Sequence, residues 1–260
     1  MIFVVYGVLI FVATCMGAFV GLGGGVIIKP VLDVINIHPL EQIAFFSSCA
    51  VFVMSVTSTA KHLRSKTPID KKTVLLLAFG SVAGGFAGNR IFDLLLKSTK
   101  FPDTVRGIQS AVLGVLLITV IVFVNVRIKR FKLKNPVAMV FAGCLLGFLA
   151  AFLGIGGGPI NVAVFTLLFS LTMKDAAVCS VAVIFFSQLT NLSAFFLTSP
   201  VLSYDLKMLL VIIPCAVLGG LVGARLNRVF SEKAIRITFS LTVSAVAALS
   251  IYNSVSSFIN

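Results

Sequence analysis

The chain has 260 residues, of which 59% are hydrophobic and only 11% are charged. A soluble domain carries about twice that share of charged residues, so the composition excludes a soluble fold, which would lack a polar shell for so large an apolar core. The net charge of +13 does not indicate nucleic-acid binding, because the basic residues cluster in connections between apolar runs. That distribution is typical of cytoplasmic loops that face anionic lipid headgroups.

Long stretches of the chain carry no charged residue at all. Examples are residues 1–28, 107–126 and 136–173. About 20 apolar residues in a helix cross the ~30 Å hydrocarbon core of a bilayer. The sequence therefore predicts an all-α polytopic membrane protein whose chain crosses the bilayer several times.

The first apolar run is interrupted by GLGGG at 21–25, and a later run is interrupted by GIGGG at 154–158. Each glycine inside a helix costs about 1 kcal/mol relative to alanine, so both motifs predict a break in a helix. New helices are expected at 26–37 and 159–171. Pro159 suits the first turn of the second one, where its missing N–H does no harm.

The two glycine motifs belong to an internal repeat. At an offset of 133 residues, GLGGGVIIKP aligns with GIGGGPINVA, and residues 41–58 align with 174–191. Small shifts of the offset align GGFAGNRI with GGLVGARL and residues 104–115 with 234–245. The order of these landmarks predicts two repeats of about 125 residues, 1–126 and 135–260, joined by a basic cytoplasmic linker at 127–134.

The repeats can be parallel or inverted, as in other transporters. If every apolar segment crosses the membrane, each half has four crossings, the repeats are parallel and Lys and Arg divide almost evenly between the two sides. If residues 2–36 and 136–171 are instead helical hairpins, each half is a Gly-broken hairpin plus three transmembrane helices. The 21 Lys and Arg then divide 15 to 6, so the positive-inside rule favours inverted repeats.

A break at membrane depth is tolerated only where its backbone is buried in protein or lines a wet cavity. The first N–H groups of a helix have no partner within the helix, and its N-terminal end is positive, so such an end binds anions. We expect the helices after Gly25 and Gly158 to direct their N-termini to one anion near the midplane. The alternative is that the glycines only allow close helix packing.

Several side chains near the breaks are candidate anion ligands. Lys29 would stand beside the first helix start as a counter-charge, or would extend to the membrane surface. Polar residues within apolar runs would supply donors, or would only bond between helices. The predicted substrate-binding set is Gly23, Gly24, Gly25, Lys29, Ser47, Thr57, Gly156, Gly157, Gly158, Asn161, Ser180, Gln188, Thr190 and Asn191.

The paired motifs GLGGGVIIKP and GIGGGPIN, with the later GGFAGNR and GGLVGAR, resemble the TauE/SafE sulfite exporter family, also called the 4-toluene sulfonate uptake permease family. The resemblance covers the whole chain. It implies a bacterial or archaeal inner-membrane transporter of small sulfur-containing anions, such as sulfite or sulfonates. The first motif ends in Pro30, whereas the second has Ala163 there, so the two half-sites need not be equivalent.

We therefore expect a secondary transporter of a small sulfur-containing anion. The alternatives are a passive anion channel and a transporter of a non-sulfur anion. Paired carboxylates, a histidine cluster or a nucleophile with its base would indicate an enzyme, and the sequence shows none, so we expect neither catalysis nor a cofactor nor a metal. The expected partners are the small anionic substrate and the lipid bilayer, without nucleic acid; a homo-oligomer is left open.

Overall fold

The computed structural model of the chain describes residues 2–35, 37–65, 71–98, 102–125, 131–198 and 204–259. All regular structure within these ranges is helical, as predicted. The helices are α1 (Ile2–Val20), α2 (Gly25–Ile35), α3 (Leu40–Arg64), α4 (Lys71–Ser98), α5 (Pro102–Asn125), α6 (Pro136–Leu153), α7 (Gly158–Leu168), α8 (Met173–Thr198), η2 (Leu206–Met208, a 3₁₀ turn), α9 (Leu209–Val229) and α10 (Glu232–Ile259).

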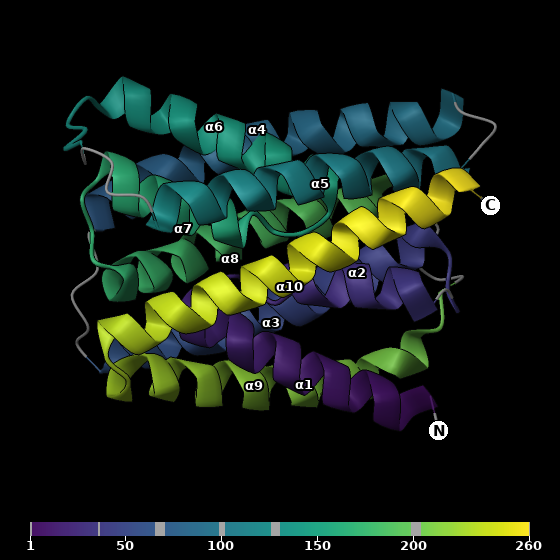
Figure 1. The fold of residues 1–260 in the computed structure, drawn as a ribbon, viewed down its shortest axis with the longest axis horizontal. Coiled ribbons are helices and arrows are strands. Elements are labelled where there is room, and N and C mark those ends of the chain that lie inside the picture. The colour runs from purple at the N-terminus through teal and green to yellow at the C-terminus, as the bar shows by residue number, and fades with distance from the viewer. Residues whose placement is uncertain are drawn as a thin grey trace.

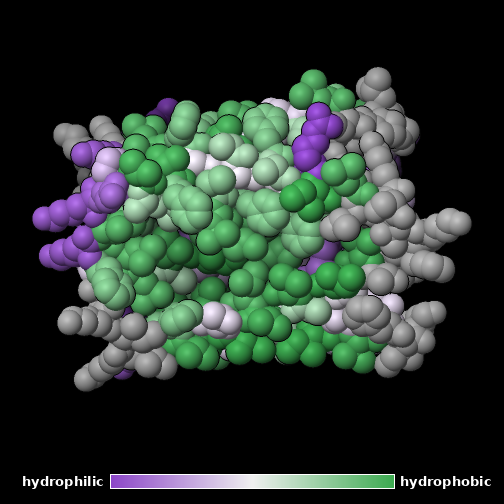
Figure 2. All heavy atoms as spheres, turned by 90° about the horizontal axis from the view of Figure 1, so that it is seen from above, coloured by the Kyte–Doolittle hydropathy of each residue, from purple (hydrophilic) through white to green (hydrophobic). Residues whose placement is uncertain are grey.

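Eight of the described helices are long and apolar enough to cross a membrane. The remaining α-helices, α2 and α7, have 11 residues each, about half of what a crossing needs. The long helices lie side by side in one bundle (Figure 1). On the side of the bundle shown in Figure 2, hydrophobic residues cover the middle, and hydrophilic residues gather at one end, with a few nearer the other. The prediction of a polytopic helical membrane protein is confirmed.

The two short helices occupy opposite halves of the bundle. Helix α2 lies in the half where α1 begins, and α7 lies in the other half, where α6 begins (Figure 1). Helix α1 packs along α9, and α6 packs along α4. In the repeat alignment α1 corresponds to α6 and α9 to α4, so these two packing pairs are counterparts of each other.

Glycines allow these paired helices to approach each other closely. An added Cβ would lie 1.8 Å from the carbonyl oxygen of Cys144 at Gly84, and 2.5 Å from that of Phe148 at Gly88. On α9, a Cβ at Gly223 would lie 2.2 Å from the carbonyl oxygen of Cys15. The GGxxG elements of both repeats are therefore helix-packing surfaces, since small residues let backbones meet.

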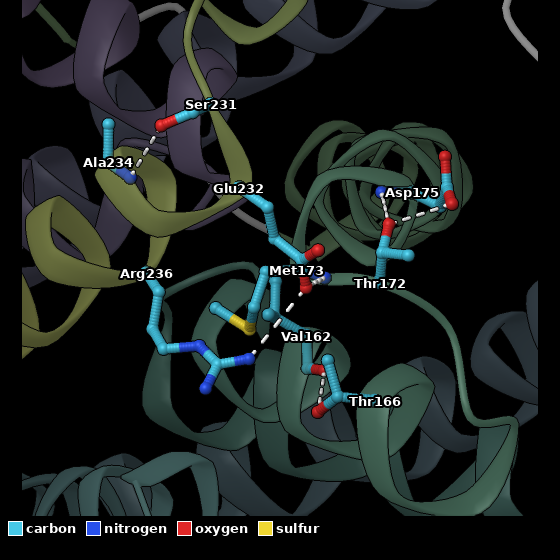
Figure 3. Close-up of polar contacts among 9 residues, drawn as sticks. All are labelled: Val162, Thr166, Thr172, Met173, Asp175, Ser231, Glu232, Ala234 and Arg236. Atoms are coloured by element: carbon cyan, nitrogen blue, oxygen red, sulfur yellow. Dashed lines mark hydrogen bonds and ion pairs between the residues drawn. The ribbon is translucent and has the colours of Figure 1, made fainter.

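The start of α8 shows how a helix N-terminus is ordinarily satisfied. Thr172 Oγ1 accepts from the backbone N–H of Asp175 at 3.1 Å, as an N-cap side chain does, and donates to Asp175 Oδ2 at 2.8 Å (Figure 3). Glu232 accepts from the N–H of Met173 and pairs with Arg236 at 3.7 Å. Side chains therefore supply the acceptors that the first turn needs.

The short helices end earlier than the sequence indicates. Helix α2 ends at Ile35 and α7 at Leu168, whereas the sequence predicts ends at 37 and 171. Ser170 has a φ of +55°, which an α-helix cannot continue through. The predicted linker 127–134 falls partly outside the described residues; in its described part, the N–H groups of Phe131 and Leu133 donate to carbonyls at the end of α7.

Candidate anion-binding site

The two glycine breaks meet each other in the interior of the protein. A Cβ added to Gly158 would lie 1.8 Å from the carbonyl oxygen of Leu22, and one added to Gly25 would lie 2.9 Å from that of Ile155. All four residues are buried. Each short helix therefore begins against the backbone of the other break, an approach that any larger residue would block.

The contacts between the breaks are reciprocal under the repeat alignment. Leu22 aligns with Ile155 and Gly25 with Gly158, so the two contacts above exchange with each other. Two further pairs do the same: Gly21 faces Val162 while Gly154 faces Lys29, and Gly23 faces Ile184 while Gly156 faces Val51. When a residue of one break contacts a partner in the other, and the aligned residues make the same contact in reverse, the two segments are related by a two-fold axis. The breaks are therefore related locally by an approximate two-fold.

The glycine backbone adopts left-handed conformations on both sides of this contact. Positive φ angles occur at Gly21, Gly23 and Gly24, and at their counterparts Gly154, Gly156 and Gly157. Such φ angles are strained for residues with a Cβ. These turns place a row of peptide N–H groups at the start of each short helix.

Many of these N–H groups have no acceptor. Within the described part of the chain, the N–H groups of Gly24 and Val26 in the first break donate no hydrogen bond, nor do those of Gly156, Gly157 and Gly158 in the second. No side chain caps the start of α7, in contrast to α8. A buried unpaired N–H is unfavourable, and unpaired N–H groups at the start of a helix favour an anion.

Polar side chains lie beside these amides. The Oγ of Ser47 would be 3.2 Å from a Cβ at Gly25, and Oδ1 of Asn161 would be 3.4 Å from one at Gly157. Both atoms are buried and have no hydrogen-bond partner in the described structure. Ser180, the counterpart of Ser47, donates instead to the carbonyl of Gly21 at 2.8 Å. The structure thus places Ser47, Asn161 and Ser180 at the breaks.

Lys29 belongs to α2, but its side chain reaches the C-terminal end of α6 and not the start of α2. Its side chain is 4% exposed, and Nζ donates to the carbonyl of Leu153 at 2.7 Å and to Oε1 of Gln109 at 2.8 Å. Gln109 in turn donates to the carbonyl of Phe152 at 2.7 Å. The ammonium therefore neutralises the negative C-terminal end of the broken helix.

The second repeat has no equivalent of this cap. The counterparts of Lys29 and Gln109 are Val162 and Phe239, and both are buried. The end of α1 is satisfied differently: Asn227 donates to the carbonyl of Phe19 at 2.8 Å. The two breaks therefore differ at these positions, since the helix before one break is capped by a cation and the helix before the other by an amide.

A chain of amide side chains leads away from the second break. Nε2 of Gln188 would lie 2.5 Å from a Cβ at Gly156. Oε1 of Gln188 accepts from Asn191 at 3.1 Å, and Oδ1 of Asn191 accepts from Asn89 at 3.1 Å. Gln188 and Asn191 are buried. These residues form a polar track through an otherwise apolar bundle.

Two predicted site residues lie in helix-packing contacts instead. Thr57 donates within its own helix, to the carbonyls of Val53 and Met54, and its Oγ1 would be 2.3 Å from a Cβ at Gly220. Its counterpart Thr190 donates to the carbonyl of Phe186 and faces Gly85. The structure does not bring either hydroxyl to the meeting point of the breaks.

Sequence reasoning did not single out three residues that make polar contacts near the breaks: Asn89, Gln109 and Asn227. Asn89 extends the amide track, and Gln109 and Asn227 bond to the ends of the broken helices. Each is a polar residue inside or beside an apolar run, so the signal was present but weak. Among the described residues, no three His, Cys, Asp or Glu side chains lie close enough to hold a metal ion.

A family model described as "Sulfite exporter TauE/SafE" matches residues 6–250. The chain belongs to this family. A probable membrane transporter, YunE of Bacillus subtilis, is 26% identical over 98% of this chain and 99% of its own length. A probable membrane transporter of Methanocaldococcus jannaschii, MJ0441, is 24% identical over 88% of both chains.

The family reaches beyond prokaryotes. An Arabidopsis thaliana protein named "Sulfite exporter TauE/SafE family protein 5" is 34% identical over 42% of this chain and 25% of its own length. No match to a solved structure reaches significance. The TauE/SafE assignment and the eight candidate spans agree on a multi-pass membrane transporter family.

Proposed function

We propose that this TauE/SafE family member is a secondary transporter of a small sulfur-containing anion, sulfite or a sulfonate, in the cytoplasmic membrane. The observation that carries the proposal is the row of unpaired, buried N–H groups at Gly24, Val26 and Gly156–Gly158, where two helix N-termini meet. Oxyanions accept several hydrogen bonds at once, and helix starts supply donors together with a positive dipole end. Ser47 adds a hydroxyl donor.

We further propose that the repeats are inverted. Two features support this arrangement: the short helices α2 and α7 lie in opposite halves of the bundle (Figure 1), and the contacts between the breaks are reciprocal. Inversion places the anion on the two-fold, at equal depth from both faces. Small movements of one hairpin against the other would then open the site to either side alternately, as inverted repeats do in other transporters.

The proposed orientation places the basic connections in the cytoplasm, by the positive-inside rule. The membrane potential, negative inside, then favours export: one negative charge moving outward gains about 2.3 kcal/mol per 100 mV. The amide track through Gln188 and Asn191 would give the anion polar contacts on one path from the site. A passive anion channel and a carrier of a non-sulfur anion are the competing functions.

Flux from sulfite-loaded proteoliposomes tests the proposal. Wild-type protein should give saturable sulfite efflux that other sulfur oxyanions inhibit. Ser47→Ala should raise the half-saturating sulfite concentration by about tenfold or more, because a hydrogen bond to a charged group contributes about 1.5–3 kcal/mol. Since Oγ of Ser47 has no partner, this variant should fold normally.

Ser55→Ala is the matched control: it lies on the same helix, is buried, and its hydroxyl donates only to the carbonyl of Phe52 on that helix. Its flux should equal that of wild type. Flux that rises linearly with sulfite would favour the channel. Inhibition by chloride or phosphate but not by sulfonates would favour a non-sulfur substrate. Equal flux of the Ser47 and Ser55 variants would contradict anion binding at this site.

A further inference from the structure

An apolar groove of about 510 Å³ runs along the outer face of α4 and α6. Its volume lies within the ~300–1,000 Å³ range of small-molecule sites. Its lining includes the small residues Gly80 and Ala83, and also Val137 and Phe141, which are 74% and 73% exposed. The lining residues are Leu76, Gly80, Ala83, Pro136, Val137, Val140, Phe141 and Cys144. In a membrane, this face meets lipid.

The two helices that border the groove run in the same direction. Gly80, Gly84 and Gly88 of α4 face the carbonyls of Val140, Cys144 and Phe148 of α6, so both helices advance by four residues together. By this register, the start of α6 lies level with Leu76. Both helix N-termini, at Lys71 and Pro136, therefore lie towards the same end of the groove.

That end of the groove is basic. Lys72 lies one turn before Leu76, and Lys134 and Lys132 lie two and four residues before Pro136; all three lysines are exposed. Neither helix has an acidic residue in its first turn. Two helix N-termini and three lysines thus concentrate positive charge where the apolar groove reaches the membrane surface.

A phospholipid with an anionic headgroup matches both parts of this surface. Its acyl chain is apolar and lies in the membrane beside the groove, and its phosphate lies at the depth of the lysines. Basic residues at the cytoplasmic end of a transmembrane helix attract the anionic lipids of that leaflet. We propose that the α4–α6 groove binds an acyl chain of an anionic phospholipid whose headgroup is held by Lys72, Lys132 and Lys134.

A second copy of the chain fits this surface less well. A two-fold dimer through this face, with its axis along the membrane normal, would place the same three lysines of both copies at one end of the interface. Like charges in proximity repel, whereas an anionic lipid neutralises them. The proposal rests on the orientation proposed above, which places this end of the groove in the cytoplasm, but it does not depend on the transported substrate.

Two measurements test the site: native mass spectrometry and thermal melting. Each compares added phosphatidylglycerol with added phosphatidylcholine that carries the same acyl chains. The wild type should retain phosphatidylglycerol in preference to phosphatidylcholine, and only phosphatidylglycerol should raise the melting temperature by several degrees. Ala83→Phe fills the groove and should abolish the difference. Ala87→Phe is the control, because Ala87 is exposed one turn along α4 and does not line the groove.

The charge part of the site has its own pair of variants. Lys72→Gln/Lys132→Gln/Lys134→Gln should weaken phosphatidylglycerol binding at least tenfold. Arg64→Gln/Arg225→Gln/Lys233→Gln removes the same charge from other exposed positions and should not. Equal binding of both lipids, or unchanged phosphatidylglycerol binding by Ala83→Phe, would overturn the proposal. If the wild type is a dimer without added lipid and Ala83→Phe makes it monomeric, the groove is a subunit interface and not a lipid site.

Discussion

Lys29 Nζ donates a hydrogen bond to the carbonyl oxygen of Leu153 across 124 positions of sequence, at 2.7 Å. The contact joins the short helix of the first repeat to the broken end of α6 in the second. Gln109 bonds both to Lys29 and to the neighbouring carbonyl of Phe152. A cation and an amide from the first repeat thus complete a helix terminus of the second.

Lys29→Met should lower the free energy of unfolding by about 2–4 kcal/mol, because it withdraws a donor from two buried acceptors, each worth about 1–3 kcal/mol when left unpaired. Lys29→Val combined with Gln109→Phe copies the apolar pair of the second repeat, and should be less destabilising than the sum of the two single variants. Thermal melting of the wild type, the two single variants Lys29→Val and Gln109→Phe, and the double variant, all solubilised in detergent, gives a double-mutant cycle. Strict additivity would contradict a coupled cap.

Adjacent glycines in the first GGxxG element should respond differently to substitution by alanine. Gly84→Ala places a Cβ 1.8 Å from the carbonyl oxygen of Cys144, so it should separate α4 from α6 and lower the melting temperature by 5 °C or more, by an order-of-magnitude estimate. Gly85→Ala meets only the methyl of Thr190 at 3.3 Å and should be nearly neutral, helped by the higher helix propensity of alanine.

Gln188→Glu should impair anion transport more than it impairs folding. The substitution keeps the shape of the side chain but adds a negative charge close to Gly156, so it should repel an anion bound at the N–H groups of the second break. We expect the half-saturating sulfite concentration to rise at least tenfold, which corresponds to about 1.4 kcal/mol. Asn89→Asp, at the far end of the amide track, is the control and should have a smaller effect. Equal effects of the two would argue against charge at the break.

Thr172→Ala should destabilise the protein by about 1 kcal/mol, the usual effect of losing an N-cap side chain. Its hydroxyl makes the two capping hydrogen bonds with Asp175. Ser231→Ala is a useful comparison, since its hydroxyl accepts only a longer bond of 3.3 Å from the N–H of Ala234. Chemical denaturation would show the difference, and sulfite flux should be unchanged in both variants.

Local sequence patterns were sufficient to predict a helical membrane protein and the positions at which the two short helices begin. Apolar runs determine which segments cross the membrane, and four glycines in five positions cannot continue a helix at low cost. Both determinants act within one segment. The structure accordingly places helix starts at Gly25 and Gly158, within a residue of the predicted positions.

The roles of single polar residues depended on contacts that sequence spacing does not contain. Lys29 lies four positions after the glycines, which suggested a counter-charge for the anion, yet its acceptors come from α5 and α6. Thr57 and Thr190 share the register of the predicted site, but glycines of α9 and α4 face them. The same residue types serve ligand binding and helix packing, and only the neighbouring helix decides between them.

The cap of α6 by Lys29 also sets an order of events during biosynthesis. A ribosome that adds about 5–20 residues per second needs roughly 6–25 s to proceed from Lys29 to Leu153. During that interval the ammonium lacks the Leu153 carbonyl, to which it donates in the finished protein. The contact between α2 and α6 therefore forms only after α6 has entered the membrane. The interior of the first repeat is complete only once this part of the second repeat is in place.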